Sequence, residues 1–286
     1  MKKFLTFFLI FSMTFLAWSK NDQPAYVIYN SKGDEASFEK MLKMAREKSY
    51  IFFGEYHNNP IAHWLQFELT KSMFELKKND LVLGAEMFES DNQYIIDEYL
   101  AGMISEKSFS EEVRLWPNYN TDYKPLLEFA KANKLPFIAT NIPRRYASMV
   151  FKKGLESLNN LSDLAKSYIV PLTSFQFDST VTCYKDLMQG DHGGFNMANA
   201  QAIKDATMAY FIEKNMTTDG TFLHFNGAYH SDNYQGIIHY LKKNVDLSEI
   251  MTISTVTQED VSALHDDNKN IADFIICVPE TMTTTH

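Results

Sequence analysis

The sequence predicts an α/β fold with a mainly parallel sheet, helices on both faces of the sheet, and helical insertions over its carboxyl edge. Short apolar runs rich in β-branched and aromatic residues alternate with segments of helical periodicity. Most of these runs lack a polar alternation, which is typical of strands buried on both faces. The 286 residues, 45% of them hydrophobic and 22% charged, are enough to bury a substantial core.

The predicted elements follow this alternation along the chain. The predicted strands are 50–53, 81–85, 136–140, 221–225, 251–256 and 274–278. The apolar stripes that predict helices are 38–45, 65–76, 95–100, 126–130, 203–211 and 234–241. Segments 102–120 and 155–194 interrupt this alternation of strands and helices, and we expect largely helical insertions there. Neither is rich in Pro, Gly or Ser, so residues 20–286 are expected to form a single domain.

Residues 1–19 have the pattern of a signal peptide. Lys2 and Lys3 precede an apolar stretch that is short for a membrane span, and Ala17 and Ser19 are small residues at the positions that a signal peptidase reads. We therefore expect an exported protein, periplasmic or associated with the outer membrane; the alternative is a retained N-terminal anchor. No cysteine lies near the cleavage site, so a lipoprotein anchor is not expected.

The charge balance argues against nucleic acid as a partner. The chain has 27 Lys and Arg against 36 Asp and Glu, a net charge of −9, and lacks a basic run that would follow a phosphate backbone. Cys183 and Cys277 lie far apart, and either one disulfide or two buried thiols fits the sequence. Zinc-finger spacing is absent, which excludes a structural zinc ribbon.

Polar side chains follow four of the predicted strands. In open parallel sheets, ligands bind at the carboxyl ends of the strands. The side chains expected to converge on one cleft there are Glu55, His57, Glu86, Arg144, Arg145 and His230. His192 lies between glycines, and we expect it in a mobile loop rather than in this site.

Two of the strand ends share the pattern Gly-x-Tyr-His, which ends at His57 and at His230. The glycine permits a sharp turn, and the polar pair that follows can cap a helix. Both histidines would then lie beside helix N-termini, which depress the pKa of an imidazole and keep it neutral. Together with Glu55 and Glu86, they form a set that a divalent ion such as zinc can accept.

Arg144 and Arg145 occupy the predicted first turn of a helix, where cations oppose the helix dipole. An anion is therefore expected beside them. It is either a buried partner, Glu55 or Glu86, or the carboxylate or phosphate of a ligand. The sequence leaves both alternatives open.

The motifs around these residues occur in a recognisable order. They are Gly54-Glu55-Tyr56-His57-Asn58-Asn59-Pro60, Glu86-Met87-Phe88, Trp116 with Tyr123-Lys124-Pro125-Leu126-Leu127, Asn141-Ile142-Pro143-Arg144, Gln201 with Asp205 to Ala209, and Gly227-Ala228-Tyr229-His230. This set resembles the ChaN-like haem-binding proteins of the haem-uptake, Tiki and erythromycin-esterase-like superfamily. The resemblance extends over nearly all of residues 20–286.

The resemblance implies haem bound at the carboxyl edge of the sheet, with a tyrosine as iron ligand, a dimer around paired haems, and outer-membrane haem-uptake components as partners. Tyr123 is the expected ligand, at the start of a predicted helix over 123–134. The other tyrosines in or near site segments are Tyr56, Tyr146, Tyr184 and Tyr229. The expected haem contacts are Glu55, His57, Arg144, Arg145 and His230, with the arginines offsetting the propionates.

The wider superfamily implies an alternative, a metal-dependent hydrolase of the peptidase or esterase type. Its catalytic residues would be Glu55, His57, Glu86, Arg145 and His230, and its metal ligands would be His57, His230 and Glu86. A Gly-x-Ser-x-Gly elbow and a His-Glu-x-x-His helix are both absent from the sequence. We therefore favour haem binding, chiefly on the resemblance.

Overall fold

The computed structural model describes residues 23–189 and 194–286, so the predicted signal peptide and His192 lie outside the described residues. The strands are β1 (Val27–Asn30), β2 (Glu35–Ala36), β3 (Tyr50–Glu55), β4 (Leu81–Glu89), β5 (Phe137–Asn141), β6 (Thr221–Gly227), β7 (Ile250–Gln258) and β8 (Phe274–Pro279). All the predicted strands are present, and each begins within one residue of its predicted start.

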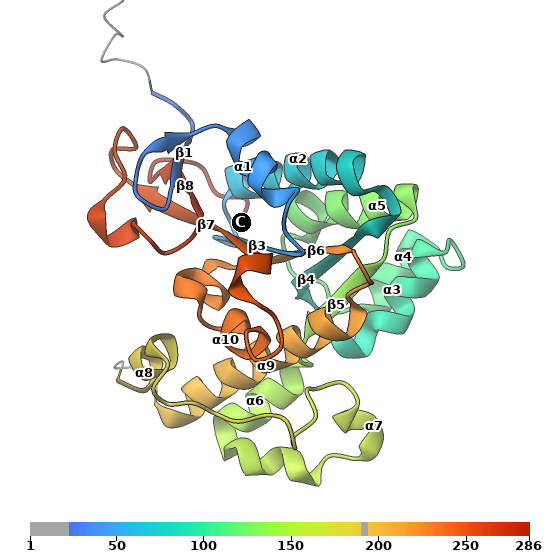
Figure 1. Ribbon diagram of the computed structural model, residues 1–286. Coiled ribbons are helices and arrows are strands. Elements are labelled where there is room, and N and C mark those ends of the chain that lie inside the picture. The colour runs from blue at the N-terminus through green and yellow to red at the C-terminus, as the bar shows by residue number, and fades with distance from the viewer. Residues whose placement is uncertain (1–22, 190–193) are drawn as a thin grey trace, which may run out of the picture.

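The strands form one eight-stranded sheet in the order β2-β1-β8-β7-β3-β6-β4-β5 (Figure 1). Strands β3 to β8 are parallel, whereas β1 pairs antiparallel with β8 and β2. The predicted mainly parallel α/β fold is therefore confirmed. The sequence did not predict the edge strands β1 and β2, because four and two residues carry too little periodicity to be recognised.

The helices lie between the strands in sequence. They are α1 (Phe38–Ala45), α2 (Pro60–Lys77), α3 (Gln93–Leu100), α4 (Glu106–Glu112), α5 (Lys124–Asn133), α6 (Arg144–Lys153), α7 (Asp163–Lys166), α8 (Thr182–Gln189), α9 (Phe195–Asn215) and α10 (Ile237–Leu241). The two interrupting segments are less helical than expected. Segment 102–120 contains α4, and segment 155–194 contains α7, α8 and a 3-10 stretch, Leu155–Asn160.

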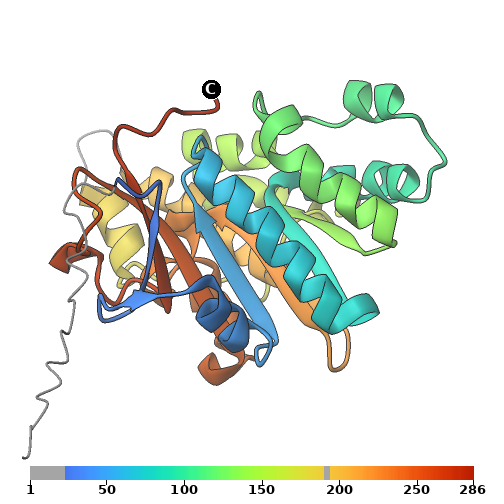
Figure 2. The same ribbon diagram turned by 90° about the horizontal axis from the view of Figure 1, so that it is seen from above.

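Helices cover both faces of the sheet: α1, α2 and α5 lie on one side, and α6, α9 and α10 lie on the other (Figures 1 and 2). Neighbouring residues of β3 show why both faces are buried. Ile51 packs into the first core and Phe52 into the second, and neither is more than 1% exposed. The sheet is thus the rigid middle layer, and its carboxyl edge is left for a site.

Two further expectations concern the thiols and the membrane. Cys183 and Cys277 are free thiols rather than a disulfide. Within residues 23–189 and 194–286, none of the helices combines the length and the apolar character needed to cross a membrane.

Candidate functional site

A cavity of about 520 Å³ lies at the carboxyl ends of the central strands, beside α6 and α9. Its volume falls within the range of about 300–1,000 Å³ that is common for small-molecule sites. The residues that line it are His57, Glu86, Glu89, Trp116, Asn141, Ile142, Arg144, Ala147, Ser148, Phe151, Met197, Ala200, Gln201, Lys204 and His230.

The first Gly-x-Tyr-His segment brings His57 into this cavity. Asn59 then caps α2, because its side-chain oxygen accepts from the backbone N–H groups of Ile61 and Ala62, each at 3.0 Å. The His57 ring lies directly against Gly227 of β6, where an added Cβ would come within 2.8 Å of His57 Nε2. Glycine at this position therefore allows the two neighbouring segments to share one site.

A buried chain of hydrogen bonds, the relay of Glu55, Tyr123 and Gln66, lies behind His57. Its Nδ1 donates to Glu55 Oε1 at 2.9 Å, and the same oxygen accepts from the Tyr123 hydroxyl at 2.7 Å. The other oxygen of Glu55 accepts from the Gln66 amide. Because Nδ1 carries the proton toward Glu55, Nε2 is the ring nitrogen left for a ligand.

A second buried relay of hydrogen bonds, formed by Asp205 and Tyr184, lies behind His230. Its Nδ1 donates to Asp205, whose other oxygen accepts from the Tyr184 hydroxyl at 2.8 Å. Unlike His57, however, His230 also has a carboxylate at its second nitrogen, since Nε2 lies 3.0 Å from Glu86 Oε1. The backbone N–H of Gly227 donates to Glu86 Oε2 at 2.8 Å and fixes that carboxylate. Both ring nitrogens of His230 are therefore engaged.

The carboxylates determine the charge of both histidines. Burial alone would lower the pKa of His230, but Glu86 and Asp205 raise it to about 10. Burial also opposes the charge on His57, but Glu55 and Glu86 raise the pKa of that ring above its usual value. The predicted depression of both pKa values is therefore wrong, because buried carboxylates outweigh the partial charge of a helix N-terminus.

The two adjacent arginines have different environments. Both lie in the first turn of α6, as predicted. Arg144 lines the cavity, and its backbone N–H donates to Glu89 Oε2 at 2.9 Å. Arg145 forms a salt bridge with Asp91, and its guanidinium lies 4.4 Å from the centre of the Tyr146 ring. Arg145 is not among the residues that line the cavity.

The anions beside α6 are thus Glu89 and Asp91, and neither was predicted from the sequence. The proposed buried pairing of Glu55 and Glu86 with the arginines is wrong, because each glutamate is bonded to a histidine instead. Strand β4 continues to Glu89, four residues beyond its predicted end, and this extension brings the two acids to the N-terminus of α6.

Tyr123 precedes α5 and ends a π-helical turn, Tyr119–Tyr123. It is 1% exposed, and its ring packs edge-on against His63 and Trp116. Tyr56 and Tyr229 are exposed, whereas Tyr146 and Tyr184 are buried. In the described part of the chain, the residues that line the cavity include no tyrosine.

Several cavity residues received no role from the sequence. Trp116 places its ring edge-on to His57, with 4.8 Å between ring centres. Gln201 and Lys204 enter from α9, as does Asp205 behind His230. A buried acid within an otherwise apolar helical stripe was the available signal for Asp205, which is 1% exposed.

The arrangement suits an organic ligand better than a bare metal ion. In the described ranges, no group of three or more His, Cys, Asp or Glu side chains is placed to hold a metal ion. The cavity instead combines apolar walls with the cations Arg144 and Lys204 and with one imidazole, that of His57, which has an open nitrogen. Glu86 and Glu89 also line it, but His230 pairs with the first and Arg114 with the second. A flat apolar molecule with anionic groups and a Lewis-acidic centre fits this combination.

Comparison with solved structures gives related folds at low sequence identity. A structure of ChaN of Campylobacter jejuni, described as binding haem cofacially, has a TM-score of 0.62 and 14% identity, covering 88% of this chain and 96% of that one. An erythromycin esterase variant in its open conformation has a TM-score of 0.51 and 10% identity, covering 88% and 97%. A Bacillus cereus protein has a TM-score of 0.50 and 11% identity, covering 85% and 92%.

No curated protein matches the sequence. A family model described as haem-binding uptake, Tiki superfamily, ChaN, matches residues 41–241. That range contains strands β3, β4, β5 and β6 and both Gly-x-Tyr-His segments, and the match confirms the resemblance drawn from the motifs. The chain therefore belongs to the ChaN family of haem-binding uptake proteins in the Tiki superfamily.

Proposed function

We propose that this chain is an exported protein of haem or iron uptake and that it holds haem in the cavity at the carboxyl edge of the sheet. The observation that carries the proposal is the composition of that cavity, in which apolar walls occur together with two cations and an imidazole nitrogen that have no carboxylate partner among the described residues. Membership of a haem-binding family supports the choice of ligand.

The walls provide the apolar surface that a porphyrin needs. Trp116, Ile142, Phe151 and Met197 are among the residues that line the cavity. Phe151 is 50% exposed and Met197 is 38% exposed. A flat apolar ligand would cover this surface, and its removal from water favours binding.

Two cationic side chains are placed to bind the haem propionates. Arg144 and Lys204 line the cavity, and in the described part of the chain neither forms a salt bridge with a carboxylate. In a chain of net charge −9, two cations that lack such partners in the described residues and lie in one cavity favour an anionic ligand. Arg145 is left out of this role because Asp91 already pairs with it.

The group best placed to meet the iron is His57. Its side chain is 38% exposed, its Nε2 has no hydrogen-bond partner in the described residues, and Glu55 orients the ring from behind. A carboxylate behind a ligating imidazole is a common arrangement at metal sites. Tyr123 would have to release Glu55 and leave its buried position to reach the cavity, so we assign it to orienting the Glu55–His57 pair.

The neighbouring arginines provide a matched test of the site. Arg144→Ala is expected to weaken haem binding by about tenfold, because a charge-assisted contact to a propionate is lost. Arg145→Ala removes the same charge one residue away and is expected to leave haem affinity unchanged. Absorbance titrations of both purified variants measure this, and equal losses in the two would contradict the assigned cavity.

The histidines test the iron contact in the same way. His57→Ala is expected to change the Soret band of the bound haem, whereas His265→Ala, which alters an exposed histidine on a loop, should not. A wild-type spectrum in His57→Ala would exclude His57 as the ligand. Iron analysis of the same samples gives the haem stoichiometry.

Export and assembly are separate parts of the proposal. The pattern in residues 1–19 supports export, and the mass of the mature protein recovered from cells would show whether its chain begins at residue 20. The family resemblance supports a dimer around paired haems and outer-membrane uptake partners. Sedimentation with and without haem tests the dimer, which should appear only in the loaded sample.

The hydrolase alternative has less support from the site. Glu86 and His230 do meet in the cavity, but both nitrogens of His230 are held by carboxylates. The raised pKa keeps this ring protonated near neutral pH, so it is unsuited to act as a general base.

A further inference from the structure

The C-terminal segment, residues 280–286, runs from β8 back to the loop that carries His57. Near its start, the backbone N–H of Glu280 donates to the carbonyl of Gln258 at 2.9 Å, and Met282 packs against the first core. The end of the segment lies beside the start of α2 (Figure 2). The segment is therefore held to the body of the protein along its length rather than at β8 alone.

Thr285 makes two hydrogen bonds in this region. Its backbone N–H donates to the carbonyl of Asn58 at 3.0 Å, and its hydroxyl donates to Asp122 Oδ2 at 2.7 Å. Asn58 directly follows His57 in the chain, and Asp122 belongs to the π-helical turn that precedes α5. Thr285 thus links the His57 loop to that turn.

Asp122 in turn orients two side chains that contact the His57 carbonyl. Asn118 Nδ2 donates to Asp122 Oδ2 at 2.6 Å and to the carbonyl oxygen of His57 at 2.7 Å. His63 Nε2 lies 3.3 Å from the same carboxylate oxygen and 3.1 Å from the same carbonyl oxygen. Asn118, Asp122 and His63 are each at most 6% exposed, so water competes little for these contacts.

These contacts hold the backbone of His57 and Asn58, and that backbone places the His57 ring. The carbonyl of His57 accepts from Asn118, and the carbonyl of Asn58 accepts from Thr285. The ring itself is held by one further bond, from Nδ1 to Glu55 Oε1 at 2.9 Å. A binding group has to be held within about 0.5 Å of its productive position, so a shift of this backbone would misplace Nε2.

We propose that Thr285 is a positioning residue of the haem site, which fixes the His57 loop through Asp122 and Asn58. In the described part of the chain, the residues that line the haem cavity include none from 280–286, so Thr285 acts through His57 and not on the ligand. The effect on haem rests on the proposed function. The effect on the His57 ring does not, because it is present in the haem-free protein.

The Thr285 hydroxyl can be removed without loss of bulk. Thr285→Val is expected to weaken haem binding by about fivefold, to shift the Soret band, and to move the Nδ1–H resonance of His57 in NMR spectra of the haem-free protein. Thr285→Ser keeps the hydroxyl and should retain the wild-type values. Truncation after Met282 also removes the contact with Asn58 and should weaken haem binding by about tenfold or more.

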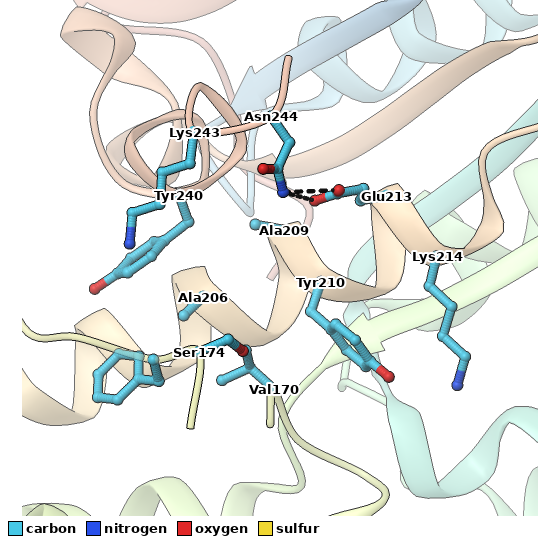
Figure 3. Close-up of a pocket in the computed structure, with 11 residues that line it drawn as sticks. Val170, Ser174, Ala206, Ala209, Tyr210, Glu213, Lys214, Tyr240, Lys243 and Asn244 are labelled. Atoms are coloured by element: carbon cyan, nitrogen blue, oxygen red, sulfur yellow. Dashed lines mark hydrogen bonds between the residues drawn. The ribbon is translucent and has the colours of Figure 1, made fainter. Parts of the chain in front are cut away.

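Two control variants make the outcome specific. Thr283→Val is the same substitution at an exposed position two residues earlier, and it should change none of these measurements. Asn244→Leu removes an amide that donates to the Glu213 carboxylate at 2.8 and 3.1 Å, beside a separate cavity of about 580 Å³ lined by residues of α9 and α10 (Figure 3). It should also leave the haem titration and the His57 resonance unchanged.

The proposal is overturned if Thr285→Val and the truncated chain keep the wild-type haem affinity and His57 resonance, even where their Tm is lower. It is also overturned if Thr283→Val causes the same losses as Thr285→Val, or if Thr285→Ser fails to restore the wild-type values. Failure of the wild type to bind haem would refute the proposed function instead. The His57 resonance of the haem-free variants would then still show whether Thr285 positions the ring.

Discussion

Replacing Tyr123 by Phe removes one buried hydroxyl and leaves the ring in place. That hydroxyl donates to Glu55 Oε1 at 2.7 Å, within the relay that orients His57. A hydrogen bond to a charged group contributes about 2 kcal/mol to stability. For domains of roughly this size, about 1 kcal/mol corresponds to about 2–4 °C in Tm, so Tyr123→Phe is expected to lower Tm by about 4–8 °C.

The haem spectrum separates the two roles of Tyr123. If Tyr123 only orients Glu55, the Phe variant keeps the wild-type Soret and charge-transfer bands, because His57 and Gln66 still hold the carboxylate. Haem affinity should then fall only a few-fold, by roughly 1 kcal/mol at most. If Tyr123 is the iron ligand, the ferric spectrum changes completely.

Tyr99→Phe is the control for this variant. Tyr99 is also a buried tyrosine whose hydroxyl donates to a carboxylate, that of Glu128, but it lies outside the haem cavity. It should lower Tm in the same way and leave haem binding intact. Loss of the wild-type spectrum in Tyr123→Phe, with no loss in Tyr99→Phe, would refute the assignment of His57 to the iron and restore Tyr123 as the ligand.

Three other predictions follow from the same contacts. Gly227→Ala places a Cβ 2.8 Å from His57 Nε2, so we expect both a lower Tm and at least a tenfold loss of haem affinity, and a normal titration would contradict the shared site. Iron binding by His57 requires a neutral ring, and the neighbouring carboxylates raise the pKa of this ring above its usual value of about 6.5. Haem affinity should therefore increase with pH above about 6.5 in the wild type and stay constant in His57→Ala. The pKa of His230 is raised to about 10 in the folded protein, so its contribution to stability is full below about 6.5 and is lost as the pH rises through about 10. Denaturant unfolding should therefore show stability falling across that interval, with a smaller fall in Glu86→Gln; equal slopes would show that Glu86 does not hold the charge of His230.

Local pattern was enough to predict the six parallel strands of the sheet, β3 to β8, and the edge at which polar residues gather. The apolar runs are buried on both faces, and this burial leaves a signature in the sequence that does not depend on distant partners. The Gly-x-Tyr-His segments follow directly from strand ends, so their position in the fold could be predicted from their place in the chain. The arginine pair could likewise be assigned to the first turn of α6.

Side-chain pairing could not be predicted in this way, because it depends on register and on helical phase. Arg144 and Arg145 are neighbours in sequence, yet a rotation of about 100° per residue sends one to the cavity and the other to Asp91. Asp205 reaches His230 from a helix 25 residues earlier in the chain. The raised pKa values of the histidines arise from such contacts, since an electrostatic effect depends on distance and burial after folding rather than on separation along the chain.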